Sequence, residues 1–280
     1  MVTLPEEYLA LKAERQRGFQ TLYTYSVLTH VDMETGFSLS VCLKDAANGQ
    51  YLKHALIGRK EEGAEIVTGS THKTFFGAQR GVIGVNYQRE DLKWGLWETI
   101  ETRTFPGSVS NHHLGTLLGQ LMAAYEMNAF KDEYQKAVVE NAKHFAKCLA
   151  AEGLDVAGDP AMDYTETHQV IVKVGYAHGP EVADRLEANN IVCNYQATPE
   201  EEGFSASGAL RMGVNEMTRF GFGKEDFAKL AHLIADCVLH HANVKEEVKK
   251  LRAEHLEMKY CFSDKDTEEL LNAFASATGI

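Results

Sequence analysis

The alternation of apolar and polar residues predicts several short strands in the first third of the chain. Residues 37–43 follow a turn at residues 34–36 and begin with an apolar–polar alternation, which suits a strand with one buried face. Residues 65–68 and 82–85 are also strand-like, and we expect the second of these runs to be buried. Residues 51–62 suit a short helix.

The rest of the chain mixes helical and strand-like periods. Two helices are predicted at about residues 114–129 and 132–151, and Gly153 is placed to cap the second. The later predicted elements are strands at residues 169–174, 191–193 and 209–214, and helices at residues 179–188, 224–241 and 265–275, the last with an N-cap at Ser263 or Asp264. This mixture of strands and covering helices predicts an α/β fold.

Composition limits the classes of function. The chain has 280 residues, of which 44% are hydrophobic, and a formal net charge of −12, which disfavours nucleic acid and anionic membranes as partners. Its five cysteines are widely spaced without a CxxC pair, so we expect reduced thiols. Neither a secretory leader nor a membrane-spanning apolar run is recognisable, and we therefore expect a cytoplasmic protein.

The segment with the clearest chemistry surrounds Lys73. This lysine lies close to the small hydroxyl residues Ser70 and Thr71, after a strand-like run and before a turn that contains Gly77 and Gly81. A lysine that forms a Schiff base needs partial desolvation and a fixed position against a carbonyl carbon. A lone lysine in a loop is more often a surface residue, so local sequence alone leaves both interpretations open.

Residues 70–81 resemble the Schiff-base lysine segment of the serine hydroxymethyltransferase family. The family signature is a Thr/Ser-rich run, His-Lys-Thr, a glycine and an Arg-Gly pair, and each part is present in order. The segment is most similar to the threonine transaldolase and 2-methylserine hydroxymethyltransferase branch, and residues 214–221 resemble the transaldolase-like proteins. The resemblance implies the end of a fold-type I aminotransferase-like large domain (residues 1–135), followed by a small C-terminal α/β domain with a helical tail (residues 136–280).

The resemblance also implies a pyridoxal 5'-phosphate site. Lys73 forms the Schiff base, and His72 lies beside it as a positioning residue. Asp45 pairs with the pyridine nitrogen, which keeps the ring an electron sink, and Asn48 stands where the family commonly carries a histidine. The other implied cofactor contacts are Ser70, Thr71, Arg80, Ser110 and Asn111, the last two reaching the phosphate of the neighbouring subunit. From local sequence, Asp45 as a turn cap and Arg80 as a surface residue remain alternatives.

Arg211 is the candidate for binding the substrate carboxylate. It lies in residues 207–213, which resemble the family's late Ser-Gly-x-x-Arg-x-Gly segment. A guanidinium group suits a carboxylate bidentately, and an internal salt bridge is the alternative. We expect no metal site at His112 and His113, because adjacent residues of a helix do not share a face. For His168 we expect a structural role.

The resemblance extends over about residues 45–239. It implies that the family's phosphate-binding loop, ring-stacking residue and substrate-binding tyrosine and glutamate precede this region, and residues 1–44 contain no such motifs. Three interpretations remain open: a split enzyme completed by a polypeptide that carries the N-terminal half, a truncated relative, and a noncatalytic assembly or interaction subunit. A complete site predicts hydroxymethyl or aldol-type transfer on serine, glycine or threonine, in a homodimer or larger assembly, with tetrahydrofolate or an aldehyde as acceptor.

Overall fold

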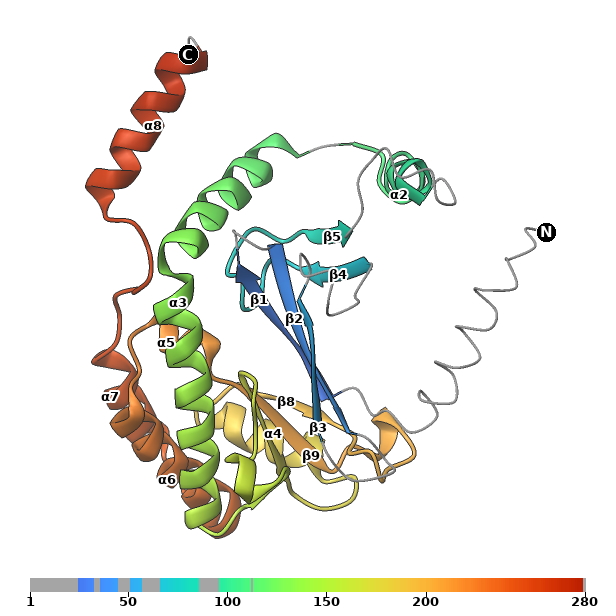
Figure 1. Cartoon of the computed structure of the whole chain (residues 1–280). Coiled ribbons are helices and arrows are strands. Elements are labelled where there is room, and N and C mark those ends of the chain that lie inside the picture. Colours follow the sequence, from blue (N-terminus) through green and yellow to red (C-terminus); the bar gives the residue numbers. More distant parts are fainter. Residues whose placement is uncertain are drawn as a thin grey trace, which may run out of the picture.

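The strands form three antiparallel sheets in the computed structural model (Figure 1). The structure describes residues 25–32, 36–44, 51–56, 66–85, 96–111 and 113–278. The first sheet comprises β1 (Tyr25–Asp32), β2 (Gly36–Lys44) and β3 (Tyr51–Leu56), and the second pairs β4 (Ile66–Ser70) with β5 (Gly81–Val85). The third has the order β6-β7-β9-β8 and comprises β6 (Asp155–Val156), β7 (Gln169–Lys173), β8 (Asn194–Gln196) and β9 (Ala209–Gly213).

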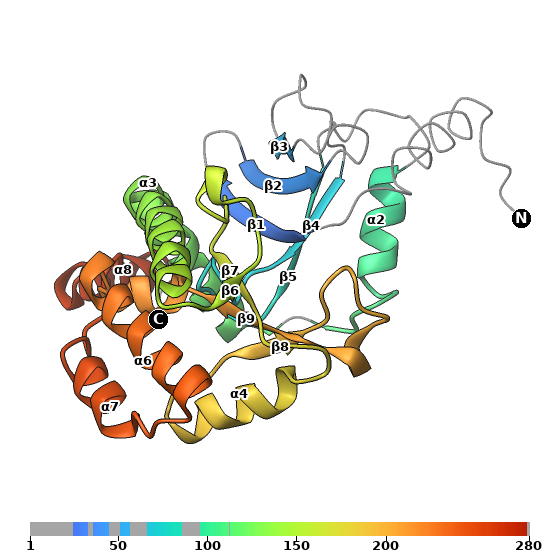
Figure 2. The same cartoon turned by 90° about the horizontal axis from the view of Figure 1, so that it is seen from below.

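The helices gather mainly around the four-stranded sheet, so the predicted α/β class is confirmed. They are α2 (Leu96–Thr104), α3 (Leu114–Ala151), α4 (Gly179–Ala188), α5 (Asn215–Arg219), α6 (Lys224–His240), α7 (Lys245–Ala253) and α8 (Asp264–Thr278), with 3-10 turns at Pro160–Met162 and Phe204–Ala206. Figure 2 shows α4 and α6 on one side of this sheet and β1 and β2 on the other. None of the helices in the described ranges is long and apolar enough to cross a membrane.

The four-stranded sheet has one apolar face that forms the core with the helices. Val170 and Val172 of β7 and Leu210 and Met212 of β9 are buried and belong to one hydrophobic cluster. Because side chains alternate along a strand, Arg211 of β9 points away from this core, on the side opposite to the helices. The alternation of side chains along each strand therefore gives the sheet one apolar face, which packs in the core, and a second face that can line a site.

Helix α3 is one continuous helix of 38 residues, whereas the sequence predicted two helices. No proline or glycine lies between the two predicted helices, so nothing interrupts the backbone hydrogen bonds there. In its C-terminal half the Phe145 ring packs against Phe227 of α6, with ring centroids 5.3 Å apart. Gly153 has φ +92° and donates its N–H to the Ala150 carbonyl at 3.0 Å, which confirms the predicted cap.

Three other predictions about elements differ from the structure. Tyr51–Leu56 is strand β3 and not part of a helix, because pairing with β2 outweighs its local helix propensity. The strand predicted at residues 82–85 is present as β5, but Ile83 is 45% exposed, so the prediction of a buried strand was wrong there. The strand predicted at residues 191–193 begins only at Asn194, as β8.

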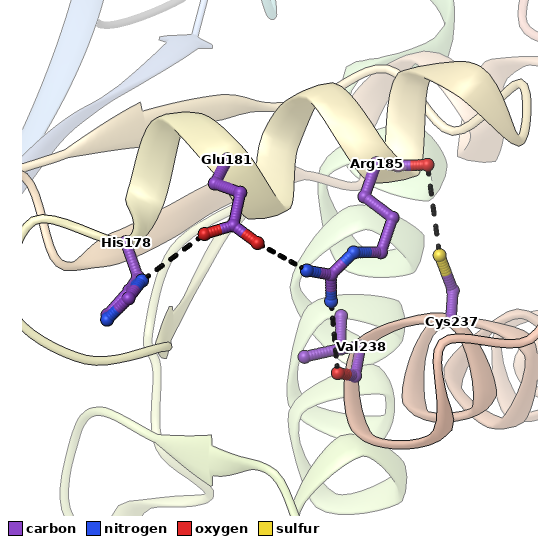
Figure 3. Close-up of polar contacts among 5 residues, drawn as sticks. All are labelled: His178, Glu181, Arg185, Cys237 and Val238. Carbon is purple, nitrogen blue, oxygen red and sulfur yellow. Dashed lines mark hydrogen bonds and ion pairs between the residues drawn. The ribbon is translucent and has the colours of Figure 1, made fainter.

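Arg185 joins α4 to α6. Its guanidinium group binds Glu181 one turn earlier on α4 at 2.7 Å and the Val238 carbonyl oxygen of α6 at 3.4 Å (Figure 3). Glu181 also pairs with His178 at 3.5 Å, and the buried Cys237 thiol points at the Arg185 carbonyl oxygen at 3.9 Å. These contacts hold the helical layer beneath the sheet together.

The segment after α7 returns to α3 before the last helix. Lys259 donates its N–H to the Arg219 carbonyl at 2.6 Å, and Phe262 donates its N–H to Glu126 Oε1 at 3.1 Å. Ser263 then caps α8: its hydroxyl accepts the Asp266 N–H at 3.2 Å, and its own N–H donates to the Asp266 carboxylate at 3.1 Å. The predicted cap at Ser263 is confirmed.

Candidate functional site

A large cleft of about 2060 Å³ is lined by the loop that joins β4 to β5 and by the four-stranded sheet, and it extends to side chains of α3, α6 and α7. The loop contributes Ser70, His72 and Lys73, and β9 contributes Arg211. Two residues that sequence analysis placed at a common site, the lysine and the carboxylate-binding arginine, thus line the same cavity although they are far apart in the chain.

The loop that carries Lys73 is shaped by hydrogen bonds to Thr71. The Thr71 N–H donates to the Arg80 carbonyl at 3.0 Å, and its hydroxyl donates to the Ala78 carbonyl at 2.7 Å. The Gly77 N–H donates back to the Thr71 carbonyl at 2.6 Å. Thr71 is therefore buried inside the loop, whereas the Lys73 side chain is exposed in the cleft.

A glycine is required at position 77. A Cβ atom there would collide with Gln120 Oε1 and lie 2.9 Å from the Thr71 carbonyl oxygen. The preceding residue, Phe76, has φ +49°, in the left-handed region that a bulky residue rarely occupies. Backbone strain of this kind persists only where the surroundings hold it in place, and it is common at functional sites.

Arg219 and Tyr134 hold Phe76 in this conformation. The guanidinium carbon of Arg219 lies 3.6 Å from the centre of the Phe76 ring, and Tyr134 makes an edge contact with the same ring at 5.3 Å. Arg219 also pairs with Glu126 of α3 at 3.1 Å, with both side chains mostly buried. Tyr134 donates its hydroxyl to the Asn215 carbonyl at 3.2 Å, and burial raises the pKa of its phenol.

Within the part of the chain that the structure describes, neither the Lys73 side chain nor the Arg211 side chain makes a hydrogen bond or an ion pair. Both are cations, and both face one cleft. A guanidinium group and an amine that line the same cleft attract anions, and the planar shape of the guanidinium group matches a carboxylate. The internal salt bridge that sequence analysis left open for Arg211 is not formed with any described residue.

His168 lines the cleft as well, although sequence analysis expected only a structural role for it. Its Nδ1 is buried and has no hydrogen-bond partner among the described residues. Burial, and then the charges of Arg211 and Lys73, lower the pKa of His168 to about 4. The neighbouring Cys193 also lines the cleft, and burial raises the pKa of its thiol to about 11, so this thiol is protonated at neutral pH.

Arg80 ties the end of the lysine loop to the start of α3. Its guanidinium group donates to the His113 carbonyl at 2.7 Å and to the Thr116 hydroxyl. Ser110 and Asn111 are exposed in the segment that precedes α3, and the described wall of the cleft does not include them. The remaining predicted site residues, Asp45 and Asn48, lie outside the described residues, as does His112.

One group outside the cleft has the residue types of a metal site. Asp226, Glu254 and His255 bring three potential ligand atoms within 4.8 Å of one another. Asp226, however, accepts the Gly223 N–H at 2.9 Å at the start of α6, and it pairs with His255 at 3.3 Å. These contacts account for the cluster as a helix cap that also contacts His255, just after α7.

Comparisons with known proteins agree with this arrangement. The sequence model of the family described as "Serine hydroxymethyltransferase" matches residues 51–234. A serine hydroxymethyltransferase of Sulfolobus acidocaldarius is 40% identical over 212 residues, which are 74% of this chain and 47% of that protein. One of Thermoplasma volcanium is 35% identical over 235 residues, which are 80% of this chain and 54% of that protein.

A solved structure is similar as well. The crystal structure of L-threonine transaldolase from Pseudomonas fluorescens in its internal aldimine state matches with a TM-score of 0.66 and 31% sequence identity, over 78% of this chain and 50% of that one. Fold and sequence together define an α/β protein of the fold-type I class of pyridoxal phosphate enzymes. The chain belongs to the serine hydroxymethyltransferase family. It spans about half the length of the curated relatives that it matches.

Proposed function

We propose that this chain provides the lysine and the carboxylate-binding arginine of a pyridoxal 5'-phosphate-dependent transferase. The reaction is hydroxymethyl or aldol-type transfer on a small amino acid, namely serine, glycine or threonine. The observation that carries the proposal is the presence, in one cleft of an α/β frame, of the Lys73 and Arg211 side chains, neither of which has a partner among the described residues. Membership in the family and the similarity to a threonine transaldolase support the same chemistry.

The residues of the cleft fit the cofactor. Lys73 extends from a loop whose hydrogen bonds are satisfied internally through Thr71, so its amine is free to react with an aldehyde. The proposed cofactor contacts are Lys73, Ser70, Asp45 and Asn48, together with Ser110 and Asn111 from a neighbouring subunit. The Thr71 hydroxyl and the Arg80 guanidinium group form bonds within the protein, so these two residues would support the site by shaping the lysine loop. When bound, pyridoxal phosphate acts as an electron sink for the electron pair released at the amino-acid Cα.

The residues of the chain itself would then position the substrate. Arg211 binds the α-carboxylate and thereby fixes the orientation of the Cα–Cβ bond, since a bidentate ion pair holds both distance and direction. His72 lies next to Lys73 on the cleft wall and positions the lysine side of the site. Apolar side chains on the same walls, such as Phe76 and Ile171, which pairs with Arg211 across the sheet, would exclude water from the reacting atoms.

An exposed apolar surface supports assembly into a homodimer or larger complex. Five apolar residues in the N-terminal half of α3 are between 46% and 69% exposed: Leu114, Leu117, Leu118, Leu121 and Tyr125. Contiguous exposed apolar patches mark interaction sites more often than free surface. A second copy of the chain, or a separate polypeptide with the N-terminal half of the family fold, is the proposed partner, and the assembly is proposed to be cytoplasmic.

The same surface favours the second candidate, a noncatalytic relative that acts as an assembly or interaction subunit. The two candidates differ in whether Lys73 binds the cofactor. The purified chain is mixed with pyridoxal phosphate, and its visible spectrum is recorded before and after borohydride reduction. Peptide mapping then locates the reduced pyridoxyl group.

We expect a visible band in the wild type and the reduced label on Lys73. The band should be lost in Lys73→Ala and kept in Lys147→Ala, whose lysine pairs with Asp163 at 2.6 Å outside the cleft. A label on another lysine would refute the assignment. If no band forms with the chain alone or with a polypeptide that carries the N-terminal half of a relative, the noncatalytic candidate is favoured.

A further inference from the structure

His168 is a polar side chain that packing does not explain. Its Nδ1 is enclosed without a partner among the described residues, and a buried polar group that is left unsatisfied destabilises the folded state. An apolar side chain at the same position would avoid this cost. Because His168 also lines the cleft, we expect the reason for a histidine at this position to lie in the part of its ring that a bound molecule can reach, and not in the enclosed Nδ1.

The ring of His168 lies over Gly213, two residues beyond Arg211 on β9. Its Cδ2 is 3.5 Å from the position that a Cβ atom of Gly213 would occupy. That position lies on the same face of the sheet as Arg211, because residues 211 and 213 share a side of the strand. The backbone connects the two strands here, since Val214 donates its N–H to the His168 carbonyl at 3.0 Å.

The imidazole is neutral at physiological pH, because the enclosed site and the charges of Arg211 and Lys73 disfavour its protonation. A neutral imidazole has one N–H donor and one acceptor nitrogen. Of its two nitrogens only Nδ1 is fully enclosed, so Nε2 is the nitrogen that remains open to the cleft. A ligand beside Arg211 therefore meets an uncharged ring nitrogen.

We propose that His168 is a second contact for the carboxylate that Arg211 binds, with the imidazole Nε2–H donating a hydrogen bond to one carboxylate oxygen. This inference rests on the proposed function in one respect, namely that the ligand of Arg211 is an amino-acid carboxylate. Arg211 supplies the positive charge that binds the carboxylate. The hydrogen bond from His168 orients the carboxylate, and the neutral imidazole adds no third cation to the cleft that holds Lys73. The neighbouring Asn215 side chain, also on the cleft wall, lies over the same glycine.

The first test observes the histidine directly and needs no cofactor. The chain is labelled with ¹⁵N in its histidine rings, and the His168 signals are identified by their absence in His168→Gln. Sodium acetate, a simple carboxylate, then replaces sodium chloride at constant ionic strength and pH 7.5. We expect a saturable shift of the His168 Nε2 signal that is lost in Arg211→Ala, while the His178 signal at the start of α4 stays constant. A His168 signal that does not move with acetate overturns the proposal.

The second test measures the affinity for an amino acid in the cofactor-loaded chain. The glycine dissociation constant is determined from the visible spectrum in the wild type, His168→Leu, His168→Gln and the control His178→Leu. We expect about tenfold weaker binding in His168→Leu, as for the loss of one hydrogen bond to a charged group, and recovery in His168→Gln, which keeps a donor. Equal constants in all four proteins overturn the proposal.

The two tests separate this inference from the proposed function. A wild-type chain that shows the acetate-dependent shift of His168 but no visible band with pyridoxal phosphate supports the carboxylate contact and contradicts cofactor binding by the chain alone. A chain that shows the band but no His168 shift contradicts the contact and leaves the proposed function standing.

Discussion

The Arg219 guanidinium group stacks on the Phe76 ring at 3.6 Å and pairs with Glu126 at 3.1 Å. The first contact reaches the loop that carries Lys73, and the second reaches α3. One side chain of α5 therefore connects the lysine loop to α3. The conformation of the lysine loop therefore depends on Arg219, a residue that lies far from the loop in the sequence.

Replacing Arg219 should destabilise the protein. Arg219→Ala removes the contact with Phe76 and leaves the mostly buried Glu126 carboxylate without its cation, so we expect a loss of about 2–4 kcal/mol in the free energy of unfolding. Urea unfolding followed by circular dichroism measures this loss. In the double variant with Glu126→Gln the loss should be smaller than the sum of the single losses, because the two residues interact. Strict additivity would contradict the pairing.

Gly77→Ala should distort the lysine loop. The added Cβ collides with Gln120 and approaches the Thr71 carbonyl to 2.9 Å, and overpacking of this kind costs about 1–3 kcal/mol. Thermal unfolding measures the change. The matched control is Gly119→Ala within α3, where nothing lies within 4 Å of the added Cβ. Alanine is the better helix former, so the control should gain about 0.5–1 kcal/mol, and a loss as large as that of Gly77→Ala would contradict this interpretation.

The buried amide of Asn141 should be important for docking α5 against α3. Its Nδ2 donates to the Thr218 hydroxyl and to the Phe222 carbonyl, both at 3.0 Å. Asn141→Leu leaves these acceptors without their donor, and we expect a loss of about 1–3 kcal/mol in urea unfolding. Thr218→Val should cost less, because the Phe222 bond remains. The reverse order would show that the amide is not the principal link.

His168 should make the stability of the cofactor-free chain depend on pH. The folded-state pKa is about 4, below the ordinary value of 6.5, so between these pH values the unfolded chain binds more protons than the folded chain. The contribution to stability is therefore fully present above pH 6.5 and is lost as the pH falls towards 4. At about 1.4 kcal/mol per pH unit, the loss is roughly 2–3 kcal/mol.

The measurement compares the free energy of unfolding of the wild type and His168→Gln from pH 4 to 7. The free energy of unfolding of the variant should depend less steeply on pH in this interval, by a slope that corresponds to the uptake of up to one proton on unfolding. Parallel curves would mean that the imidazole is protonated equally in both states, which would contradict the enclosed environment of its ring.

Sequence patterns predicted the parts of the fold that depend on neighbouring residues. The strand predicted at residues 209–214, the cap at Gly153 and the Ser263 cap of α8 all follow from local rules. The strand Tyr51–Leu56 was not predicted, because pairing with β2 decides its conformation and is not visible in its own composition.

The candidate site was predictable to a similar extent. The motifs around Lys73 and Arg211 identified two residues that the fold brings to one cleft. The stacking of Arg219 on the Phe76 ring was not predictable, since no local sequence pattern relates these two residues. The environment of His168 also depends on tertiary structure, because only the packing of β7 against β9 shows that one ring nitrogen is enclosed without a partner.

The uninterrupted helix α3 has a mechanical consequence. At 1.5 Å per residue its 38 residues form a rod of roughly 57 Å, to which the lysine loop is fixed through Arg80 near one end and through Phe76 and Tyr134 farther along. The same rod packs against the layer that carries the arginine strand (Figure 1). Helix α3 thus sets the distance between the lysine loop and the strand that carries Arg211. A mutation that bends α3 would change the width of the cleft without altering the loop or the strand.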